Sequence, residues 1–249
     1  MIDMGLIETT LERLNAFEPQ EGYYGAFSGG KDSQVLYEVV KMSGVKCEWH
    51  FQRTSVDPPQ LMTFIRENYP EVQWHSPEMT MFQLILTKKM LPTRLIRFCC
   101  KYLKTHGGAG RRVIVGVRAE ESVKRSGYKI VGQDTQKEIV RPLLDWKWND
   151  VWNFLNDRGL PHCELYDPPY KFKRIGCVGC PLQGKKMWRD FRFFPNVKNA
   201  YLHTIAMLME EGKFSDFNDP EAVLRWWIRG VNKQKFMAAE RQMTFCFDN

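Results

Sequence analysis

The chain has 249 residues, 43% of them apolar and 26% charged, and its 36 Lys and Arg outnumber its 29 Asp and Glu by seven. This is ordinary globular composition, and the length suffices for one large core or for a core with an appendage. No run of about 18 apolar residues could span a membrane, and the 8 Trp, 9 Tyr and 16 Phe exclude a disordered chain. Because the first residues carry acids and no basic region, we expect a cytoplasmic protein.

Hydrophobic periodicity predicts alternating helices and strands over the first two thirds of the chain. Apolar residues at 6, 7, 11 and 14 indicate an opening helix, and the apolar run 23–27 indicates a buried strand that leads through a glycine turn into a helix. Further strands are predicted at 46–51, 72–74 and 112–117, with helices near 59–68, 80–90, 99–105 and 148–155. Such alternation predicts an α/β fold with a Rossmann-like parallel sheet.

After Pro168-Pro169 the pattern changes to a loop with cysteines, followed by helices near 199–211 and 220–229. The last helix has an N-cap in Asp219 and a terminating glycine in Gly230. We therefore expect an α/β core over residues 1–170, with a cysteine loop and C-terminal helices over 171–249 packed on it as one structural unit.

The basic charge is concentrated in two segments. Residues 86–130 hold 12 basic and 2 acidic side chains, and residues 171–249 hold 14 and 8. A solvated surface would mix the two signs more evenly. The distribution favours a polyanionic partner, either nucleotide phosphates or nucleic acid.

One short motif, Ser28-Gly29-Gly30-Lys31-Asp32-Ser33, lies between the first predicted strand and its helix. Backbone amides and the helix dipole favour an anion there, and the glycines, the lysine and the two hydroxyls suit phosphate oxygens. A Walker A loop is excluded because Asp32 stands where the magnesium-binding Ser or Thr is required. A glycine turn without a ligand is the alternative, and Asp32 would either help hold Mg²⁺ or shape the loop.

Because we expect a cytoplasmic protein, its seven cysteines indicate metal or thiol chemistry rather than disulfides. The adjacent Cys99-Cys100 and the C-x-x-C pair of Cys177 and Cys180 would together make a four-sulfur site. An iron–sulfur cluster, a zinc ion and plain thiols are the three alternatives, and adjacent cysteines are awkward for a tetrahedral zinc ribbon. Cys163 and Cys246 are left open as reactive thiols.

The loop 28–33 and four further blocks of sequence carry a resemblance to a known family. They are the loop 28–33, Arg97-Phe98-Cys99-Cys100 with Lys104, Gly116-Val117-Arg118-Ala119-Glu120-Glu121-Ser122 with Arg125, Arg141-Pro142-Leu143-Leu144-Asp145-Trp146 leading into Asp150-Val151-Trp152, and Gly176-Cys177-Val178-Gly179-Cys180-Pro181. In this order they resemble the phosphoadenosine phosphosulfate (PAPS) reductase family of the PP-loop ATP pyrophosphatase superfamily, over roughly residues 20–195.

The resemblance implies a nucleotide site and a cluster. Ser28, Gly29, Gly30, Lys31, Asp32 and Ser33, with Gly116 and Arg118, would bind the phosphates of ATP or of a PAPS-like nucleotide, with Mg²⁺, and Lys31, Asp32 and Arg118 would act in catalysis. Arg118 also follows a predicted strand at its carboxyl end, where α/β sheets bind ligands. The four cysteines resemble the [4Fe–4S] site of assimilatory adenylylsulfate reductases and related PP-loop sulfur enzymes.

The chain departs from that family at its end. Sulfonucleotide reductases carry a catalytic cysteine in a Glu-Cys-Gly-Leu-His tail, whereas residues 244–249 read Thr-Phe-Cys-Phe-Asp-Asn. We therefore expect an ATP pyrophosphatase-type sulfurtransferase that adenylates and thiolates an acceptor. The alternatives are an adenylylsulfate or PAPS reductase that produces sulfite, and a regulatory nucleotide-binding module.

The expected acceptor is nucleic acid, either DNA or tRNA. Basic residues interleaved with aromatic rings are typical of single-stranded nucleic-acid binding, and aromatic rings follow the cysteine loop at 172, 188, 191, 193, 194, 226 and 227. The expected contact strip is Lys185, Lys186, Arg189 and Arg192. A sulfur donor such as a cysteine desulfurase is the second expected partner, and a homodimer is left open.

Overall fold

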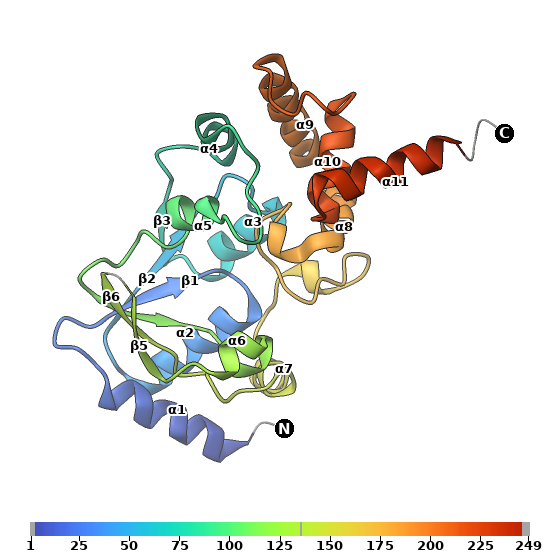
Figure 1. The fold of residues 1–249 in the computed structure, drawn as a ribbon. Helices are drawn as coiled ribbons and strands as arrows, with labels where there is room; N and C mark the ends of the chain where they lie inside the picture. Colours follow the sequence, from blue (N-terminus) through green and yellow to red (C-terminus); the bar gives the residue numbers. More distant parts are fainter. Residues whose placement is uncertain (1–2, 135, 246–249) are drawn as a thin grey trace. The chain divides into compact units, whose positions relative to one another are not determined.

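A six-stranded sheet organises the first half of the molecule in the computed structural model, which describes residues 3–134 and 136–245 (Figure 1). The strands lie in the order β3-β2-β1-β4-β6-β5. Their bounds are β1 Tyr23–Phe27, β2 Cys47–Gln52, β3 Gln73–His75, β4 Arg112–Val115, β5 Val131–Asp134 and β6 Lys137–Val140. All neighbours pair in parallel except β5, which runs antiparallel to β6 at one edge. The predicted α/β class is confirmed.

The chain divides into two compact units, and neither is continuous in sequence. The sheet unit comprises Met1–Arg53, Asp57–Ser76 and Lys104–Gly176, and the cysteine unit comprises Thr54–Val56, Pro77–Leu103 and Cys177–Asn249. The expected division at residue 170 therefore differs from the structure: the second unit begins at Cys177 and also takes in two earlier segments. Residue pattern could not show this, because the earlier segments join the C-terminal helices through packing.

The helices of the sheet unit are α1 Met4–Ala16, α2 Lys31–Ser43, α3 Pro59–Asn68, α6 Val123–Ser126 and α7 Trp148–Asp157. α2 packs against β1, α1 and α7, and Figure 1 shows α1, α2 and α7 together on one side of the sheet. α2 turns Val35, Leu36, Val39 and Val40 inward, all at most 3% exposed. An apolar face of this kind is what fixes a helix on a sheet.

The sheet order sets the position of the ligand site. β1 pairs with β2 on one side and with β4 on the other, so the direction of winding reverses between β1 and β4. The loops that follow these two strands, at 28–33 and 116–118, therefore meet at the carboxyl edge of the sheet, where open α/β sheets bind ligands.

The helices of the cysteine unit are α4 Met81–Lys88, α5 Phe98–Leu103, α8 Met187–Phe193, α9 Pro195–Glu210, α10 Pro220–Arg229 and α11 Lys233–Phe245. α10 has the predicted ends: Asp219 Oδ1 accepts the Ala222 N–H at 2.7 Å, and Gly230 takes a φ of 62°. α9 begins four residues before the prediction, because Pro195 supplies a favourable first position.

One hairpin and three α-helices were not predicted from the sequence. The β5–β6 hairpin was not predicted, because its strands are short and polar, and three of the four residues of β6 are only half-buried. The helices α6, α8 and α11 were not predicted either. Within the described residues, no helix is long and apolar enough to cross a membrane.

Candidate functional site

The loop 28–33 is closed by its own hydroxyl groups. Ser33 Oγ donates to the Gly30 carbonyl oxygen at 2.8 Å, and it accepts from the Ser28 N–H at 3.3 Å and from Ser28 Oγ at 3.1 Å. Gly30 is the N-cap of α2 and no side chain caps the helix there. The loop therefore presents the positive end of α2 on a rigid turn, as an anion site requires.

Two glycines are required at this site for different reasons. Gly29 has a φ of +69°, and a Cβ on it would lie 2.7 Å from Leu61 and Ile65 of α3. A Cβ on Gly116 would lie 2.7 Å from the carbonyl oxygen of Asp32. Gly116 therefore acts by letting the segment after β4 approach the loop, which brings Arg118 to it.

Lys31, Asp32 and Arg118, the three predicted catalytic residues, form one ionic cluster. Lys31 Nζ lies 2.8 Å from Asp32 Oδ2, and Arg118 Nε lies 2.6 Å from Asp32 Oδ1. The side chains of Lys31 and Arg118 are only 3% and 4% exposed. Burial acts to lower the pKa of Arg118, but Asp32, with Glu120 and Glu121, outweighs it and raises that pKa.

This cluster explains why an acid, Asp32, stands in the candidate anion-binding loop 28–33. Asp32 joins two buried cations from α2 and from the segment after β4, and so it fixes their positions. The geometry favours the loop-shaping role for Asp32 over the alternative of a ligand for Mg²⁺. Arg118 also donates to Glu120 Oε2 at 2.7 Å, and that carboxylate accepts the N–H of Trp148 at 2.5 Å, which ties the arginine to α7.

Tyr166, which sequence reasoning missed, contacts the loop directly. Its hydroxyl accepts the Lys31 N–H at 2.9 Å, across 135 residues of chain. The ring packs edge-on against Trp152 at 5.1 Å, and burial raises the pKa of the phenol. No motif marks this tyrosine; only the fold brings it to the first amide of α2.

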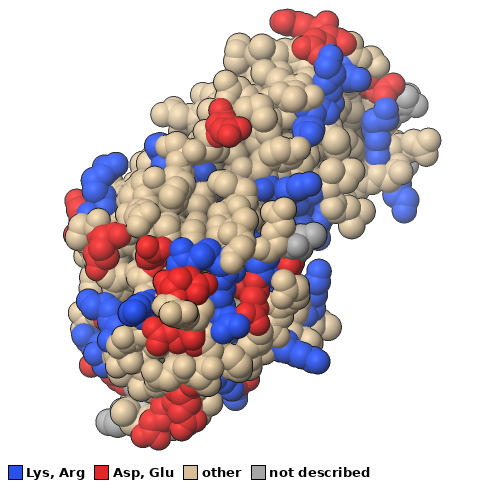
Figure 2. Space-filling model, turned by 90° about the vertical axis from the view of Figure 1, so that its left-hand side faces the viewer, with Lys and Arg blue, Asp and Glu red and all other residues tan. Residues whose placement is uncertain are grey.

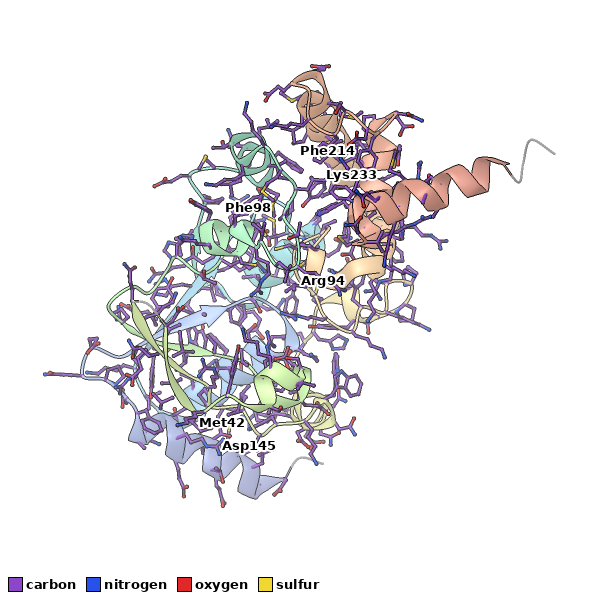
Figure 3. All side chains as sticks on the ribbon, viewed as in Figure 1. Met42, Arg94, Phe98, Asp145, Phe214 and Lys233 are labelled. Atoms are coloured by element: carbon purple, nitrogen blue, oxygen red, sulfur yellow. The ribbon has the colours of Figure 1, made fainter. Side chains whose placement is uncertain are left out.

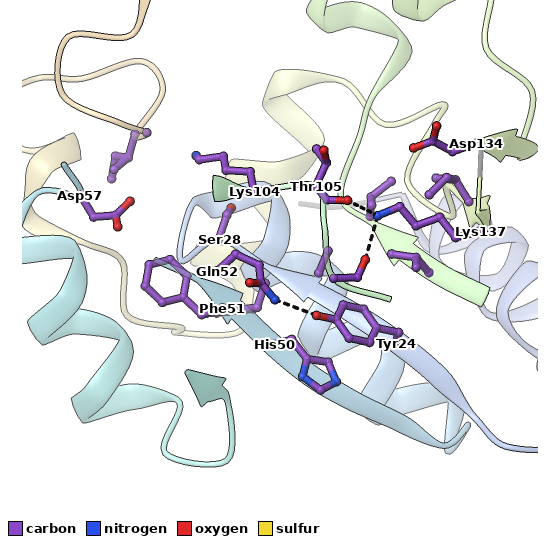
Figure 4. Close-up of a pocket in the computed structure, with 18 of the residues that line it drawn as sticks. Tyr24, Ser28, His50, Phe51, Gln52, Asp57, Lys104, Thr105, Asp134 and Lys137 are labelled. Atoms are coloured by element: carbon purple, nitrogen blue, oxygen red, sulfur yellow. Dashed lines mark hydrogen bonds between the residues drawn. The ribbon is translucent and has the colours of Figure 1, made fainter. Parts of the chain in front are cut away.

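A cavity of about 250 Å³ lies in the sheet unit beside the loop, and Figure 4 shows Ser28, Phe51 and Lys104 among its lining residues. Its floor is one face of the sheet, where the Tyr24 and His50 rings stack at 3.8 Å. Lys137 Nζ donates to the carbonyl oxygens of Thr105 and Gly107 at 2.6 and 2.8 Å.

Two of the residues that line this cavity each have a buried polar atom with no hydrogen-bond partner among the described residues: His50 Nε2 and Gln52 Oε1. Burial, reinforced by His75, lowers the pKa of His50 to about 4, so His50 is neutral at pH 7. The cavity therefore combines an aromatic floor with hydrogen-bonding groups that a ligand could satisfy.

The four predicted metal-ligating cysteines all belong to the cysteine unit. Cys99 and Cys100 lie on α5, and Cys177 and Cys180 lie on the loop that leads into a short 3-10 helix, Pro181–Lys186, just before α8. The thiol of Cys100, with burial and then the sulfurs of Cys177 and Cys180, raises the pKa of Cys99. The fold thus brings the two pairs within electrostatic range, although no group of three or more candidate ligands in the described part of the chain has metal-binding spacing as it stands.

Backbone and side-chain contacts hold the two pairs together. Arg94 Nε, on the segment leading into α5, donates to the Pro181 carbonyl oxygen at 3.3 Å. Arg94 and Phe98, the first residue of α5, are labelled in Figure 3. The Val178 N–H donates to the Val56 carbonyl oxygen at 2.8 Å, and Cys177 Sγ donates to Thr54 Oγ1 at 3.5 Å. All three segments of the cysteine unit therefore meet at the sulfurs.

The surroundings of the sulfurs suit a compact thiolate-held group. Gly179, between the two loop cysteines, has a φ of +74°, and a Cβ on it would lie 3.0 Å from Tyr201. The hydroxyl oxygen of Tyr201 is buried with no hydrogen-bond partner among the described atoms. Four soft sulfur ligands, a tight glycine turn and an unpaired hydroxyl fit an iron–sulfur cluster or a zinc ion.

Asp190 supports the cysteine loop from α8. Its side chain is 1% exposed, Oδ2 accepts from Gln183 Nε2 at 2.6 Å, and the carboxylate accepts a hydrogen bond from the Gly179 backbone. Burial raises the pKa of Asp190 to about 6, against the opposing effect of Arg189. Sequence reasoning assigned this residue no role.

The remaining cysteines do not resemble reactive thiols where the structure describes them. Cys163 is fully buried, and burial raises its pKa to about 11. Cys47 is half-buried at the start of β2, and burial raises its pKa to about 12. Cys246 lies outside the described residues.

The expected nucleic-acid strip is only partly exposed. Lys185, Lys186 and Arg192 face solvent and Arg189 is half-buried. Most of the aromatic rings expected to stack on bases are core residues instead: Phe172, Phe191, Phe194 and Trp227 are at most 6% exposed. On the face shown in Figure 2, basic side chains are interspersed with acidic ones.

Residues 23–183 match the model of the phosphoadenosine phosphosulfate reductase domain. The chain is 30% identical to adenosine 5'-phosphosulfate reductase 2 of Bacillus subtilis, over 73% of this chain and 84% of that protein. It is 29% identical to the adenosine 5'-phosphosulfate reductase of Oceanobacillus iheyensis, over 64% of this chain and 70% of that one. The phosphoadenylyl-sulfate reductase of Candida auris shares the fold, with a TM-score of 0.51 and 17% identity over 70% of this chain and 93% of that chain.

These comparisons correct one expectation. The relatives are named as reductases of a sulfonucleotide, so the expected ATP-dependent thiolation of nucleic acid is wrong. The tail at 244–249, which had counted against a reductase, lies outside the matched residues. From its first strand to the residues just beyond Cys180, the chain belongs to the phosphoadenosine phosphosulfate reductase domain family.

Proposed function

We propose that this protein reduces adenosine 5'-phosphosulfate to sulfite. The observation that carries the proposal is the 30% identity to an enzyme of that name over 73% of the chain. The loop 28–33, with two buried cations at its edge, supports it because the substrate is an anionic adenine nucleotide.

The sheet unit would bind the substrate. The loop amides and hydroxyls would hold the phosphate, with Lys31 and Arg118 balancing its charge. The neighbouring cavity of about 250 Å³ is slightly smaller than ordinary small-ligand pockets of roughly 300 Å³ or more. Its size and its aromatic floor suit the nucleoside part of the substrate, while the phosphosulfate remains at the loop.

The cysteine unit would hold a [4Fe–4S] cluster through Cys99, Cys100, Cys177 and Cys180. The convergence of three chain segments on these sulfurs supports this assignment. When bound, the cluster would supply positively polarised iron atoms and link α5 to the 177–180 loop. The protein's own part is to bury the four thiolates and orient them.

The reaction needs two thiols as reductant. A thiolate attacks the sulfur of the phosphosulfate, the sulfur–oxygen bond to phosphate breaks, and AMP leaves. A second thiol then attacks the resulting S-sulfocysteine, which releases sulfite and leaves a disulfide. Sulfur thus gains the two electrons that the thiols lose. We assign the first thiolate to Cys246, because Cys47 and Cys163 have raised pKa values and the other four cysteines hold the cluster.

The test is an anaerobic assay of the full-length protein with a dithiol donor. Adenosine 5'-phosphosulfate, its 3'-phosphorylated form and ATP are supplied separately, and sulfite, AMP and pyrophosphate are measured. We expect sulfite and AMP in equal amounts from the first substrate, and no pyrophosphate from ATP. Lack of sulfite from both sulfonucleotides would contradict the proposal.

Two variants separate binding from chemistry. Cys246→Ser should abolish sulfite release while nucleotide affinity stays unchanged. Cys47→Ser is the matched control, and it should retain activity because Cys47 lies at the start of β2, outside both candidate sites. Activity retained in Cys246→Ser would show that an external thiol attacks the substrate directly.

A further inference from the structure

Tyr201 presents an unpaired hydroxyl in the interior of the cysteine unit. The residue lies in α9, its side chain is 0% exposed, and its hydroxyl oxygen has no hydrogen-bond partner among the described atoms. Buried hydroxyls without a partner are uncommon, because removing the group from water costs free energy that nothing returns. The buried hydroxyl of Tyr201 therefore indicates that a bound group supplies its hydrogen-bond partner.

The ring is held in a fixed position. Phe82, Phe191 and Trp227 surround it at centroid distances of 5.2, 5.6 and 5.2 Å. Its Cε2 atom lies 3.0 Å from the position of a Cβ on Gly179. Because Cε2 is bonded to the carbon that carries the hydroxyl, the polar end of the ring lies at the Cys177–Cys180 loop.

Cysteine side chains exert the electrostatic influence on this hydroxyl. Among the described residues, the ionisable side chains that interact electrostatically with it are Cys177, Cys99 and Cys180. Neutral thiols are weak acceptors. Thiolates or bridging sulfides that carry the negative charge of a cluster accept hydrogen bonds strongly, since one partner is ionised.

We propose that the Tyr201 hydroxyl donates a hydrogen bond to a sulfur of the [4Fe–4S] cluster held by Cys99, Cys100, Cys177 and Cys180. The inference rests on the cluster assigned under the proposed function and adds a residue that no motif marks. The donor stabilises negative charge on sulfur, weakens the iron–sulfur bonds slightly and makes the cluster harder to oxidise.

The test compares Tyr201→Phe with the unchanged protein, both purified anaerobically with their cluster. Phenylalanine keeps the ring and its packing and removes only the hydroxyl. Tyr102→Phe is the matched control, because Tyr102 lies on α5 of the same unit with its side chain 41% exposed. Iron content and circular dichroism establish that each variant is folded and loaded.

Resonance Raman spectra give the deciding signature. In the unchanged protein and in Tyr102→Phe, the iron–sulfur stretching bands should shift between H₂O and D₂O. In Tyr201→Phe these bands should move to higher frequency and lose part of their isotope sensitivity. Oxidative bleaching by ferricyanide should also be faster in Tyr201→Phe, by about three- to tenfold, as expected for loss of one charge-assisted hydrogen bond.

The outcomes separate this inference from the function. Unchanged bands and bleaching rate in a loaded Tyr201→Phe protein would overturn the hydrogen bond, whatever the activity. Altered bands in a protein that yields no sulfite would support the hydrogen bond and overturn the reductase. A colourless wild-type protein would overturn the cluster and the hydrogen bond together, while the sulfite assay would still judge the reductase.

Discussion

The two units build their candidate sites in opposite ways. In the sheet unit, six consecutive residues form the phosphate loop and one distant arginine completes it. In the cysteine unit, three separate segments must pack before the four sulfurs meet. A site encoded in one turn depends mainly on local geometry, whereas an assembled site depends on the whole unit. Cys177→Ala and Asp190→Asn perturb the cysteine unit, whereas Asp32→Ala, His50→Gln and Tyr166→Phe perturb the sheet unit.

The largest expected effect is in the cysteine unit. Cys177→Ala should lose nearly all of about four irons per chain, because the cluster loses one of its four thiolates. Nucleotide affinity, measured by calorimetry, should remain, since the loop 28–33 belongs to the sheet unit. Cys47→Ala, in β2, is the control and should keep its iron. A brown Cys177→Ala protein would show that other ligands hold the metal.

The corresponding change in the sheet unit is Asp32→Ala. It leaves the buried Lys31 and Arg118 without their shared counter-ion, and removing one partner of a buried ion pair costs about 3–5 kcal/mol of unfolding free energy. Urea unfolding measures the loss. Asp145→Ala, whose carboxylate is 53% exposed and pairs with Arg13, should cost less than about 1 kcal/mol. Equal losses in the two variants would contradict the structural role of Asp32.

In the sheet unit, lowering the pH should reduce the unfolding free energy through His50. Burial, with His75 adding to it, lowers the pKa of His50 from 6.5 to about 4, so the unfolded chain takes up the proton first. The contribution of neutral His50 to the unfolding free energy is complete above pH 6.5 and is lost as the pH falls to about 4. The total loss is up to about 3 kcal/mol. Unfolding free energies of the wild type and of His50→Gln are measured between pH 4 and 7. The two values should approach each other as the pH falls, because only the wild type loses the contribution of His50. Parallel pH profiles would show that His50 titrates normally.

In the cysteine unit the pH dependence of the unfolding free energy has the opposite sign, and it comes from Asp190. Burial raises the pKa of Asp190 from 3.8 to about 6, so its contribution is complete below pH 3.8 and is lost as the pH rises through about 6. The loss is about 3 kcal/mol at most. Asp190→Asn, compared with the iron-loaded wild type by urea unfolding, should remove this dependence. If the wild type gains no unfolding free energy relative to Asp190→Asn as the pH falls, this contribution of Asp190 is excluded.

The smallest expected effect belongs to Tyr166. Tyr166→Phe removes the acceptor of the Lys31 N–H and should lower the unfolding free energy by about 1 kcal/mol, the typical net value of one hydrogen bond. Tyr170→Phe is the control. Its hydroxyl accepts from Gln60 Nε2 at a longer 3.2 Å, so its loss should be smaller. Tyr166 has no structural role at the loop if the two variants unfold alike.

The sequence by itself determined most of the strongly periodic elements and the chemistry that neighbouring residues carry. The strand, glycine turn and helix around residue 30 could be predicted because hydrophobic period and glycine placement are local properties. The same holds for α3, found at the predicted bounds, and for α10 with its Asp219 cap and terminating Gly230. The polar β5–β6 hairpin lacked such a signal.

Only the tertiary structure decided which distant residues meet. Arg118 was predicted from its motif, but its ion pair with Asp32 spans 86 residues, and Tyr166 reaches the loop across 135 residues. Trp227 and Phe191 suggested nucleic-acid stacking by composition, yet packing places both rings around Tyr201 in the core. Sequence pattern reports the period of an element, whereas burial and ion pairing depend on which faces of several elements come together.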